Sequence, residues 1–201
     1  MFHVVRRDAL EYLTSDALAG SVHCFSTRFG GVSEGMLASL NLGTHRRDSP
    51  ENVRENYEIL GKAVGFLPEQ TVFTRQQHTA IVAPATRADC GTGLLRERED
   101  VCDALVTNEP GVALVCFAAD CTPVLLYDPV ARAVGAAHSG WRGTAQGIAA
   151  RTVEQMQRLY GCKPGNIRAA IGPSIGQCCF ETDDDVPDAM RAALGAAAEP
   201  F

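Results

Sequence analysis

The stretch that decides the fold reads ADCTPVLLYDP from Ala119 to Pro129 and VGAAHSGWRGT from Val134 to Thr144. Apolar runs surround two short turns here, and we interpret residues 111–118, 123–127 and 133–138 as three strands. Short connections that carry aspartate and proline favour antiparallel neighbours. Such a meander would bring Cys121, in the first turn, and His138, at the end of the third strand, to the same edge of a sheet.

A thiol and an imidazole at one edge, beside a glycine-rich turn into a helix, indicate an active site. Two mechanisms are open for Cys121 and His138. The imidazole can activate the thiol as a nucleophile. Alternatively, both side chains bind a metal, and cysteine with histidine favours zinc. A third interpretation carries no chemistry, with Cys121 as a small buried residue and His138 as a hydrogen-bonded turn residue.

A catalytic zinc site needs a third protein ligand and keeps a fourth position open. The remaining histidines are His3, His23, His45 and His78. His78 is the best candidate, because it ends a predicted strand over residues 72–78. Arg142 lies near the start of the next predicted helix, where backbone N–H groups favour an anion. Phosphate is therefore a reasonable co-substrate.

Composition limits the function classes. The 201 residues suit one domain spanning residues 1–201, with 46% hydrophobic and 21% charged residues. A formal charge of −6 argues against a general nucleic-acid surface. No apolar run has the length of a membrane span and the N-terminus has no signal-peptide core, so we expect a cytoplasmic protein without membrane contact. The eight cysteines include no Cys-x-x-Cys pair, which argues against a zinc finger.

The rest of the chain predicts alternating elements around this stretch. Residues 8–17 are interpreted as a first helix from Leu10 and Leu13. Residues 27–35 form a glycine-rich loop that can approach a ligand closely. Ser49-Pro50-Glu51 is typical of a helix start. Residues 143–160 show the clearest helical pattern in the chain, and residues 167–171 predict a buried strand.

A family resemblance adds what spacing alone does not supply. The central stretch, with F-S-T-R-F-G-G-V-S-E-G, S-L-N-L-G-T-H, Q-Q-H-T, D-A-L-V-T and I-G-P-S-I-G in the family order, closely resembles the YfiH-like family. This family is also called the laccase-domain, polyphenol oxidase or peptidoglycan editing factor family. The resemblance implies a mixed α+β fold, a stacked-sheet α/β/β/α sandwich with outer helices. It also implies Zn²⁺ bound by His78, Cys121 and His138, which would be the catalytic residues.

The same resemblance implies purine nucleoside phosphorolysis, with adenosine, inosine and methylthioadenosine as substrates beside phosphate, and adenosine deamination. By motif position, Arg28, Asn41, Gln76 and Arg142 are implied pocket residues. Ser139 replaces the family's usual alanine, and Gln76-Gln77-His78-Thr79 replaces its Gln-Val-His-Gly block. Family members usually continue into an F-S-Y-R-R-like segment, so we expect that this chain lacks the family's usual C-terminal segment.

The leading hypothesis is therefore a zinc-dependent purine nucleoside phosphorylase with adenosine deaminase activity. One rival is a hydrolase that uses Cys121 and His138 on an amide or peptidoglycan precursor. Another is a non-catalytic module that binds a nucleoside. A copper oxidase fits poorly, because a multicopper cluster needs many more histidines than the five present, and no His-x-His pair occurs.

Overall fold

A central five-stranded sheet forms the body of the protein, described here by a computed structural model for residues 1–44 and 46–198. Its strand order is β10 (Arg168–Ile171), β8 (Thr122–Asp128), β9 (Ala133–Ser139), β6 (Ala104–Thr107) and β5 (Val82–Pro84). A second layer holds a three-stranded sheet of β1 (Phe2–Arg7), β2 (Leu10–Ser15) and β3 (Phe25–Ser26), and a two-stranded sheet of β4 (Thr71–Phe73) and β7 (Ala113–Val115).

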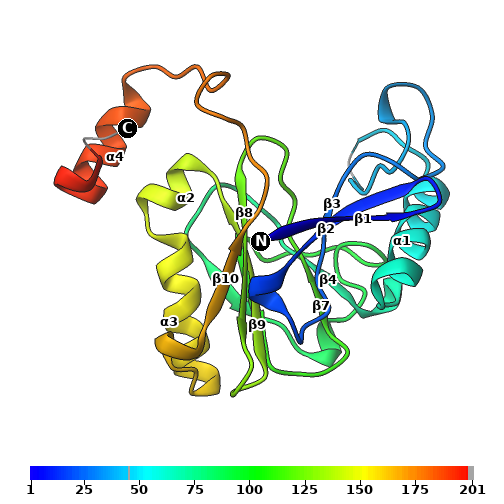
Figure 1. Cartoon of the computed structure of the whole chain (residues 1–201), viewed down its shortest axis with the longest axis horizontal. Coiled ribbons are helices and arrows are strands. Elements are labelled where there is room, and N and C mark those ends of the chain that lie inside the picture. The colour runs from blue at the N-terminus through cyan, green and yellow to red at the C-terminus, as the bar shows by residue number, and fades with distance from the viewer. Residues whose placement is uncertain (45, 199–201) are drawn as a thin grey trace.

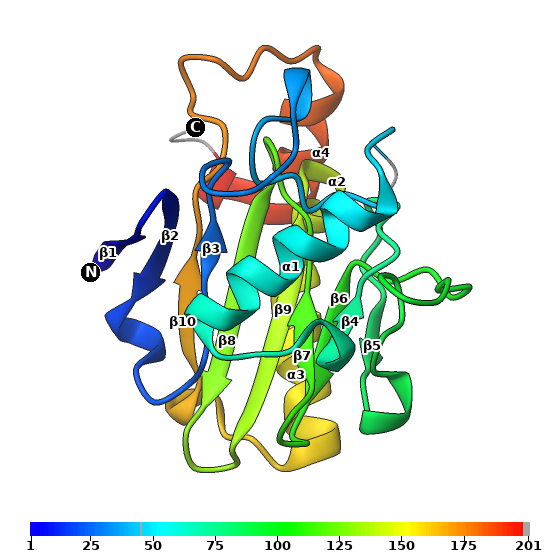
Figure 2. The same cartoon turned by 90° about the vertical axis from the view of Figure 1, so that its right-hand side faces the viewer.

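Helices cover the outer side of each layer. α2 (Trp141–Ala145) and α3 (Ile148–Tyr160) lie along one face of the central sheet, and α1 (Pro50–Val64) lies beyond the smaller sheets (Figures 1 and 2). α4 (Asp185–Leu194) follows a long connection after β10 and lies beside α2 (Figure 1). This arrangement confirms the predicted α/β/β/α sandwich. Across the described part of the chain, no helix combines the length and hydropathy needed to cross a membrane.

The β8–β9 hairpin is the centre of the sheet. Its antiparallel register runs from Thr122 opposite Ser139 to Asp128 opposite Ala133. The buried Asp128 closes the turn, because its Oδ1 accepts N–H groups from Val130 at 2.8 Å and Ala131 at 3.0 Å. A carboxylate that satisfies two turn amides fixes the register of the hairpin.

Side chains alternate across this hairpin and join the layers. Val124 and Leu126 pack toward α3, whereas Leu125 and Tyr127 pack toward β3 and the segment before it. β9 consists mostly of small residues, which lets α3 approach closely. A Cβ added at Gly135 would lie 3.1 Å from Thr152 Cγ2 and 3.2 Å from Met156 Sδ on α3.

The prediction of a three-strand meander is wrong for its first strand. Only Ala113–Val115 of residues 111–118 is a strand, and it pairs in parallel with β4 in the second layer. The chain crosses between layers after β7, and the Gln76 side chain takes up both backbone groups of Phe117. Cys121 nevertheless precedes β8 directly, so the β8–β9 hairpin alone brings it to the same edge as His138.

The helix expected over residues 8–17 is also wrong. This segment contains the turn and second strand of a hairpin, with Leu10 of β2 opposite Arg7 of β1. Leu10 and Tyr12 are both buried, which is the two-residue period of a strand. The spacing of Leu10 and Leu13 alone fits a helix, whereas the spacing of Leu10 and Tyr12 fits a strand.

Three further boundaries differ from the prediction. The helix expected over residues 143–160 is two helices, separated where Gly147 takes a left-handed φ of 76°. The strand expected over residues 72–78 ends at Phe73, so His78 lies in a loop. β10 is an edge strand with only Ala170 buried, rather than the buried strand expected.

α1 begins where the sequence predicts, directly after Ser49. The Ser49 side chain accepts the Asn52 N–H, and Gly65 ends the helix with a φ of 108°. The buried Asn56 on this helix anchors the glycine-rich loop, since its Oδ1 accepts the Val32 N–H and its Nδ2 donates to Ser33 Oγ. The loop is thereby held against a helix rather than left free on the surface.

Asp48 joins the same loop to the start of α1, and we predict that this contact is sensitive to acid. Hydrogen bonds, first from Ser33 and then from Asn41, lower its pKa to about 2. An unfolded aspartate titrates near pH 3.9, so its stabilising contribution is full above that value and is lost as the pH falls toward 2. The difference in free energy of unfolding between the natural chain and an Asp48→Asn variant should therefore shrink between pH 5 and pH 2.5. Urea unfolding at both pH values measures it, and an unchanged difference would contradict the assignment.

Candidate metal centre

The structure brings His78, Cys121 and His138 together, as the sequence predicts. One ligand atom from each lies within 4.8 Å of the others, and no other such cluster of histidine, cysteine, aspartate or glutamate occurs in residues 1–44 and 46–198. Cys121 Sγ lies 3.7 Å from His78 Nε2. The two imidazole rings meet edge to face, with centroids 4.9 Å apart.

Each donor comes from a different part of the fold. His138 is on β9, opposite Pro123 of β8, and Cys121 lies just before β8. His78 comes from the loop after β4 and takes a left-handed φ of 57°. His138 is buried, Cys121 is half-buried and His78 is exposed. The site thus opens to solvent on the His78 side.

Asp103, a site residue not predicted from the sequence, is a fully buried aspartate directly before β6. Its Oδ1 bonds to His138 Nδ1 at 2.9 Å and accepts the His78 N–H at 3.0 Å. Its Oδ2 accepts the N–H groups of Gln77 and Thr79 and the Thr79 hydroxyl. The signal was present in the sequence, since an aspartate inside the run VCDALVT needs buried partners.

Burial and hydrogen bonding act in opposite directions on this carboxyl group. Burial raises the pKa of Asp103, but the hydrogen bonds from Thr79, His138 and Gln77 outweigh it and leave the pKa lowered. Asp103 is therefore an ionised, acceptor-only group at neutral pH. Burial raises the pKa of Cys121, and the carboxylates of Asp120 and Asp103 raise it further. A free Cys121 is accordingly a thiol, and binding a metal cation would release its proton.

A cavity of about 1140 Å³ contains all three donors. Arg28, Asn41 and Gln76 also line it, while Arg142 lies outside it. Much of the remaining wall is apolar, including Phe117. The combination of an apolar cavity and a few convergent polar groups is typical of a small-molecule site.

The polar wall residues already have partners. Arg28 donates from Nε and Nη2 to the Ala38 carbonyl, and Asn41 donates to Asp48 Oδ2. Gln76 binds both backbone groups of Phe117. These contacts shape the wall, and they leave Arg28 as a cation on it.

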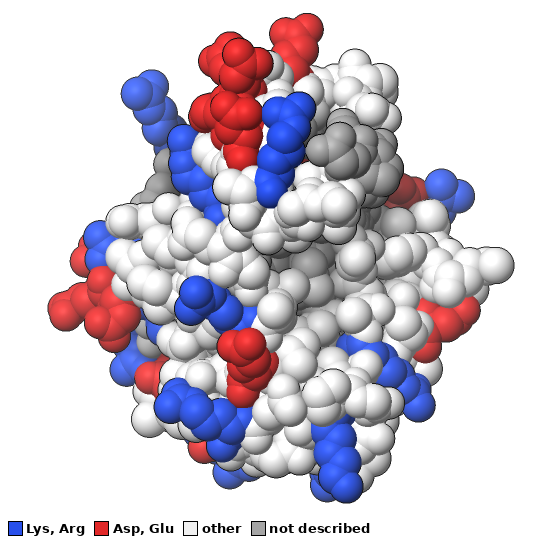
Figure 3. All heavy atoms as spheres, turned by 90° about the vertical axis from the view of Figure 1, so that its left-hand side faces the viewer, with Lys and Arg blue, Asp and Glu red and all other residues white. Residues whose placement is uncertain are grey.

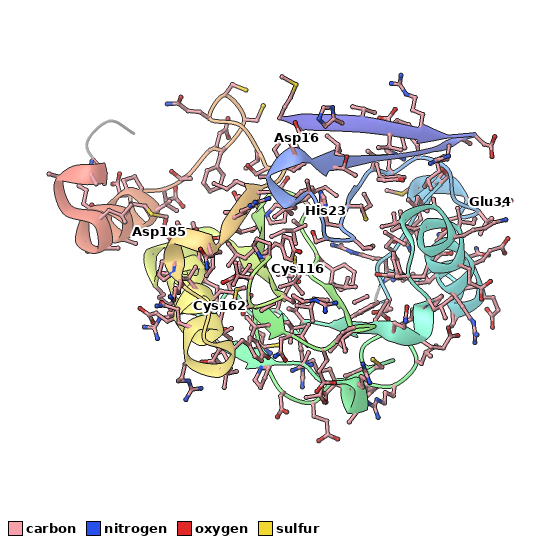
Figure 4. The ribbon with its side chains drawn as sticks, turned by 60° about the horizontal axis from the view of Figure 1, so that its bottom comes forward. Asp16, His23, Glu34, Cys116, Cys162 and Asp185 are labelled. Carbon is pink, nitrogen blue, oxygen red and sulfur yellow. The ribbon has the colours of Figure 1, made fainter. Side chains whose placement is uncertain are left out.

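Arg142, His3 and His23 are not members of the donor cluster. Arg142, on α2, stacks over Trp141 with its guanidinium carbon 4.0 Å from the ring centroid. His3 bonds to Asp16, and His23, which is labelled in Figure 4, accepts the Ser15 N–H and lines the cavity. His45 lies outside the described residues.

The surface charge agrees with the composition on the face that carries α2 and α3. Lysine and arginine side chains are scattered there among acidic ones and separated by wide uncharged areas (Figure 3). A nucleic-acid surface needs a continuous basic patch, which this face does not present.

The donor chemistry identifies the kind of metal that fits. One thiolate and two imidazoles at this spacing match a tetrahedral site with one position left open. A multicopper cluster would need many more histidines than the five in the sequence. The donor set therefore suits a single borderline-soft ion.

Fold and site together define a mixed α/β protein with a candidate Cys-His-His metal site in a large cavity. The chain belongs to the multi-copper polyphenol oxidoreductase laccase family, whose model matches residues 22–201. It is 41% identical over 178 residues to purine nucleoside phosphorylase YlmD of Geobacillus stearothermophilus, covering 88% of this chain and 65% of that protein. It is 44% identical over 171 residues to purine nucleoside phosphorylase of Deinococcus radiodurans, covering 85% and 63%.

A solved structure supports the same assignment. The crystal structure of YlmD from Geobacillus stearothermophilus matches with a TM-score of 0.88 and 38% identity, covering 96% of this chain and 73% of that one. The chain thus shares its fold with that protein. It spans less than two thirds of the length of the two relatives named above.

Proposed function

We propose that the protein is a zinc-dependent purine nucleoside phosphorylase acting on adenosine, inosine and methylthioadenosine, with adenosine deaminase activity at the same site. The observation that carries the proposal is the convergence of His78, Cys121 and His138 in one large cavity. Relatives at 41% and 44% identity are named purine nucleoside phosphorylase, which supports the substrate class.

Phosphorolysis joins a phosphate oxygen to ribose C1′ as the bond from C1′ to the purine nitrogen breaks and the electron pair leaves with the base. Holding both reactants in line supplies much of the rate of such a reaction. The apolar wall around Phe117 would hold the nucleoside and exclude water, and Arg28 would hold the phosphate. When bound by the three donors, zinc supplies Lewis acidity at its open position.

Arg28 lines the cavity and Arg142 does not, so substituting each arginine tests which one binds phosphate. A charged hydrogen bond contributes about 1.5–3 kcal/mol, so Arg28→Ala should raise the phosphate KM about tenfold or more. Arg142→Ala should change it less than about twofold, because Arg142 lies outside the cavity. Initial rates against phosphate concentration at saturating inosine measure both. A larger effect at Arg142 would move the phosphate site to α2.

The activity itself is tested by incubating zinc-loaded protein with adenosine, with and without phosphate. Phosphorolysis yields adenine and ribose 1-phosphate only when phosphate is present, whereas deamination yields inosine in both cases. His78→Ala is the matched control, since His78 is exposed and its removal should leave the fold intact. If neither product exceeds this control, the enzyme proposal fails. Saturable nucleoside binding without turnover would then support a binding module.

A cysteine hydrolase is the rival that one observation favours, namely the 3.7 Å contact between Cys121 Sγ and His78 Nε2. A nucleophilic cysteine normally has a lowered pKa. The pKa of Cys121 is instead raised by burial and by two carboxylates. Stoichiometric alkylation of Cys121 in zinc-loaded protein would favour the hydrolase, because a metal-bound thiolate in a closed shell reacts slowly.

A further inference from the structure

The Asp103 side chain contacts both histidine segments of the site. Its Oδ1 meets His138 Nδ1 and the His78 N–H, and its backbone carbonyl accepts the His138 N–H at 2.7 Å. No part of this residue is exposed to solvent. We infer that Asp103 is the positioning residue of the metal site, setting the tautomer of His138 and the backbone that presents His78.

The tautomer follows from the chemistry of the hydrogen bond. Both oxygens of the Asp103 carboxyl group accept hydrogen bonds from residues 77–79, so the proton between Asp103 and His138 belongs to His138 Nδ1. A neutral imidazole with hydrogen on Nδ1 has its lone pair on Nε2. Asp103 thus directs the Nε2 lone pair of His138 toward Cys121 and His78, as carboxylates do behind metal-binding histidines.

The presentation of His78 follows from its backbone. A left-handed φ of 57° is uncommon for a residue other than glycine and needs support from its surroundings. The N–H groups of Gln77, His78 and Thr79 all point at the Asp103 carboxylate, at 3.1, 3.0 and 2.8 Å. Three successive amides around one anion form a nest, which holds the loop in this conformation.

This inference rests on the proposed metal site but not on phosphorolysis, so metal binding alone tests it. Cobalt(II) is a suitable probe, because its absorption spectrum reports a tetrahedral cysteine and histidine set. In Asp103→Asn, the side-chain N–H₂ group faces either backbone N–H donors or His138 Nδ1. If it faces His138 Nδ1, it donates to that nitrogen, and the ring hydrogen of His138 moves to Nε2. Chelator competition should then show cobalt bound about 10- to 100-fold more weakly than by the natural chain.

Asp128→Asn is the matched control. Asp128 is equally buried and also accepts backbone N–H groups, but it lies at the opposite end of the β8–β9 hairpin from Cys121. Asparagine keeps an Oδ1 acceptor for the Val130 and Ala131 N–H groups, so the hairpin register should be retained. This variant should therefore bind cobalt within about twofold of the natural chain. Equal cobalt affinity in the Asp103→Asn variant and the natural chain would overturn the inference.

A second measurement decides the case if Asp103→Asn does not fold. Nitrogen-15 NMR of the histidine side chains in the metal-free natural chain reports the His138 tautomer directly. Hydrogen on Nδ1 is expected for the neutral ring, and hydrogen on Nε2 would overturn the inference.

Discussion

A Gly140→Ala variant is expected to keep its fold and lose most of its metal affinity. A Cβ added at Gly140 would lie 2.6 Å from His78 Cδ2 and 3.0 Å from Cys121 Sγ. Gly140 has a φ of −70°, which any residue adopts, so the methyl group strains the site and not its own backbone. The exposed His78 ring is the group that can move, and its displacement removes a ligand. A displacement of about 1 Å can lower kcat/KM about 100-fold.

The control for this variant is Gly165→Ala, where no atom lies within 4 Å of the added carbon. Metal content after dialysis, the thermal midpoint and phosphorolysis of inosine should be measured on both. Gly165→Ala should match the natural chain in metal content and turnover. Full metal occupancy in Gly140→Ala would show that His78 and Cys121 do not hold the ion together.

Cys121→Ser and His78→Ala should each lower turnover about 1000-fold. Metal assistance contributes several kcal/mol to a reaction barrier, and each 1.36 kcal/mol is tenfold in rate. A serine hydroxyl has nearly the size of the thiol but does not supply a thiolate ligand. Because the ligands act as one unit, the double variant should be no slower than either single variant.

Cys178→Ser is the matched cysteine control, because Cys178 is exposed in the connection before α4. It should retain natural turnover and metal content. If the turnover losses of the two single variants instead multiply in the double variant, Cys121 and His78 act at separate steps. Far-UV circular dichroism on each variant separates loss of chemistry from loss of structure.

The sequence predicted the donor cluster because two of its members lie at one end of a single hairpin. The β8–β9 pairing is local, and the turn residues around Asp128 indicate it directly. His78 is harder to place from the sequence, since it follows β4 by several residues. Its backbone N–H is held at the site by the Asp103 carboxylate, which is distant in the sequence. The family resemblance, rather than spacing, selected it firmly.

The failures have a common physical cause. β7 was predicted as a neighbour of β8, but it pairs with β4, and a run as short as Ala113–Val115 does not reveal its partner. The sequence does not reveal that Gly140 must lack a Cβ. The atoms that a Cβ would contact belong to His78 and Cys121, which approach from other segments. Tertiary contacts of this kind leave no periodic pattern in the chain.

The β8–β9 register has a thermodynamic consequence for folding. Cys121 and His138 lie at one end of this hairpin, and a slip of one residue would turn every β9 side chain to the opposite face. An ion that needs both donors binds only the native pairing, so its binding free energy adds to the free energy of unfolding. With the ion at 100 times its Kd this linkage contributes about 2.7 kcal/mol. Zinc availability in the surroundings would then set the fraction of chains that is folded, independently of any turnover.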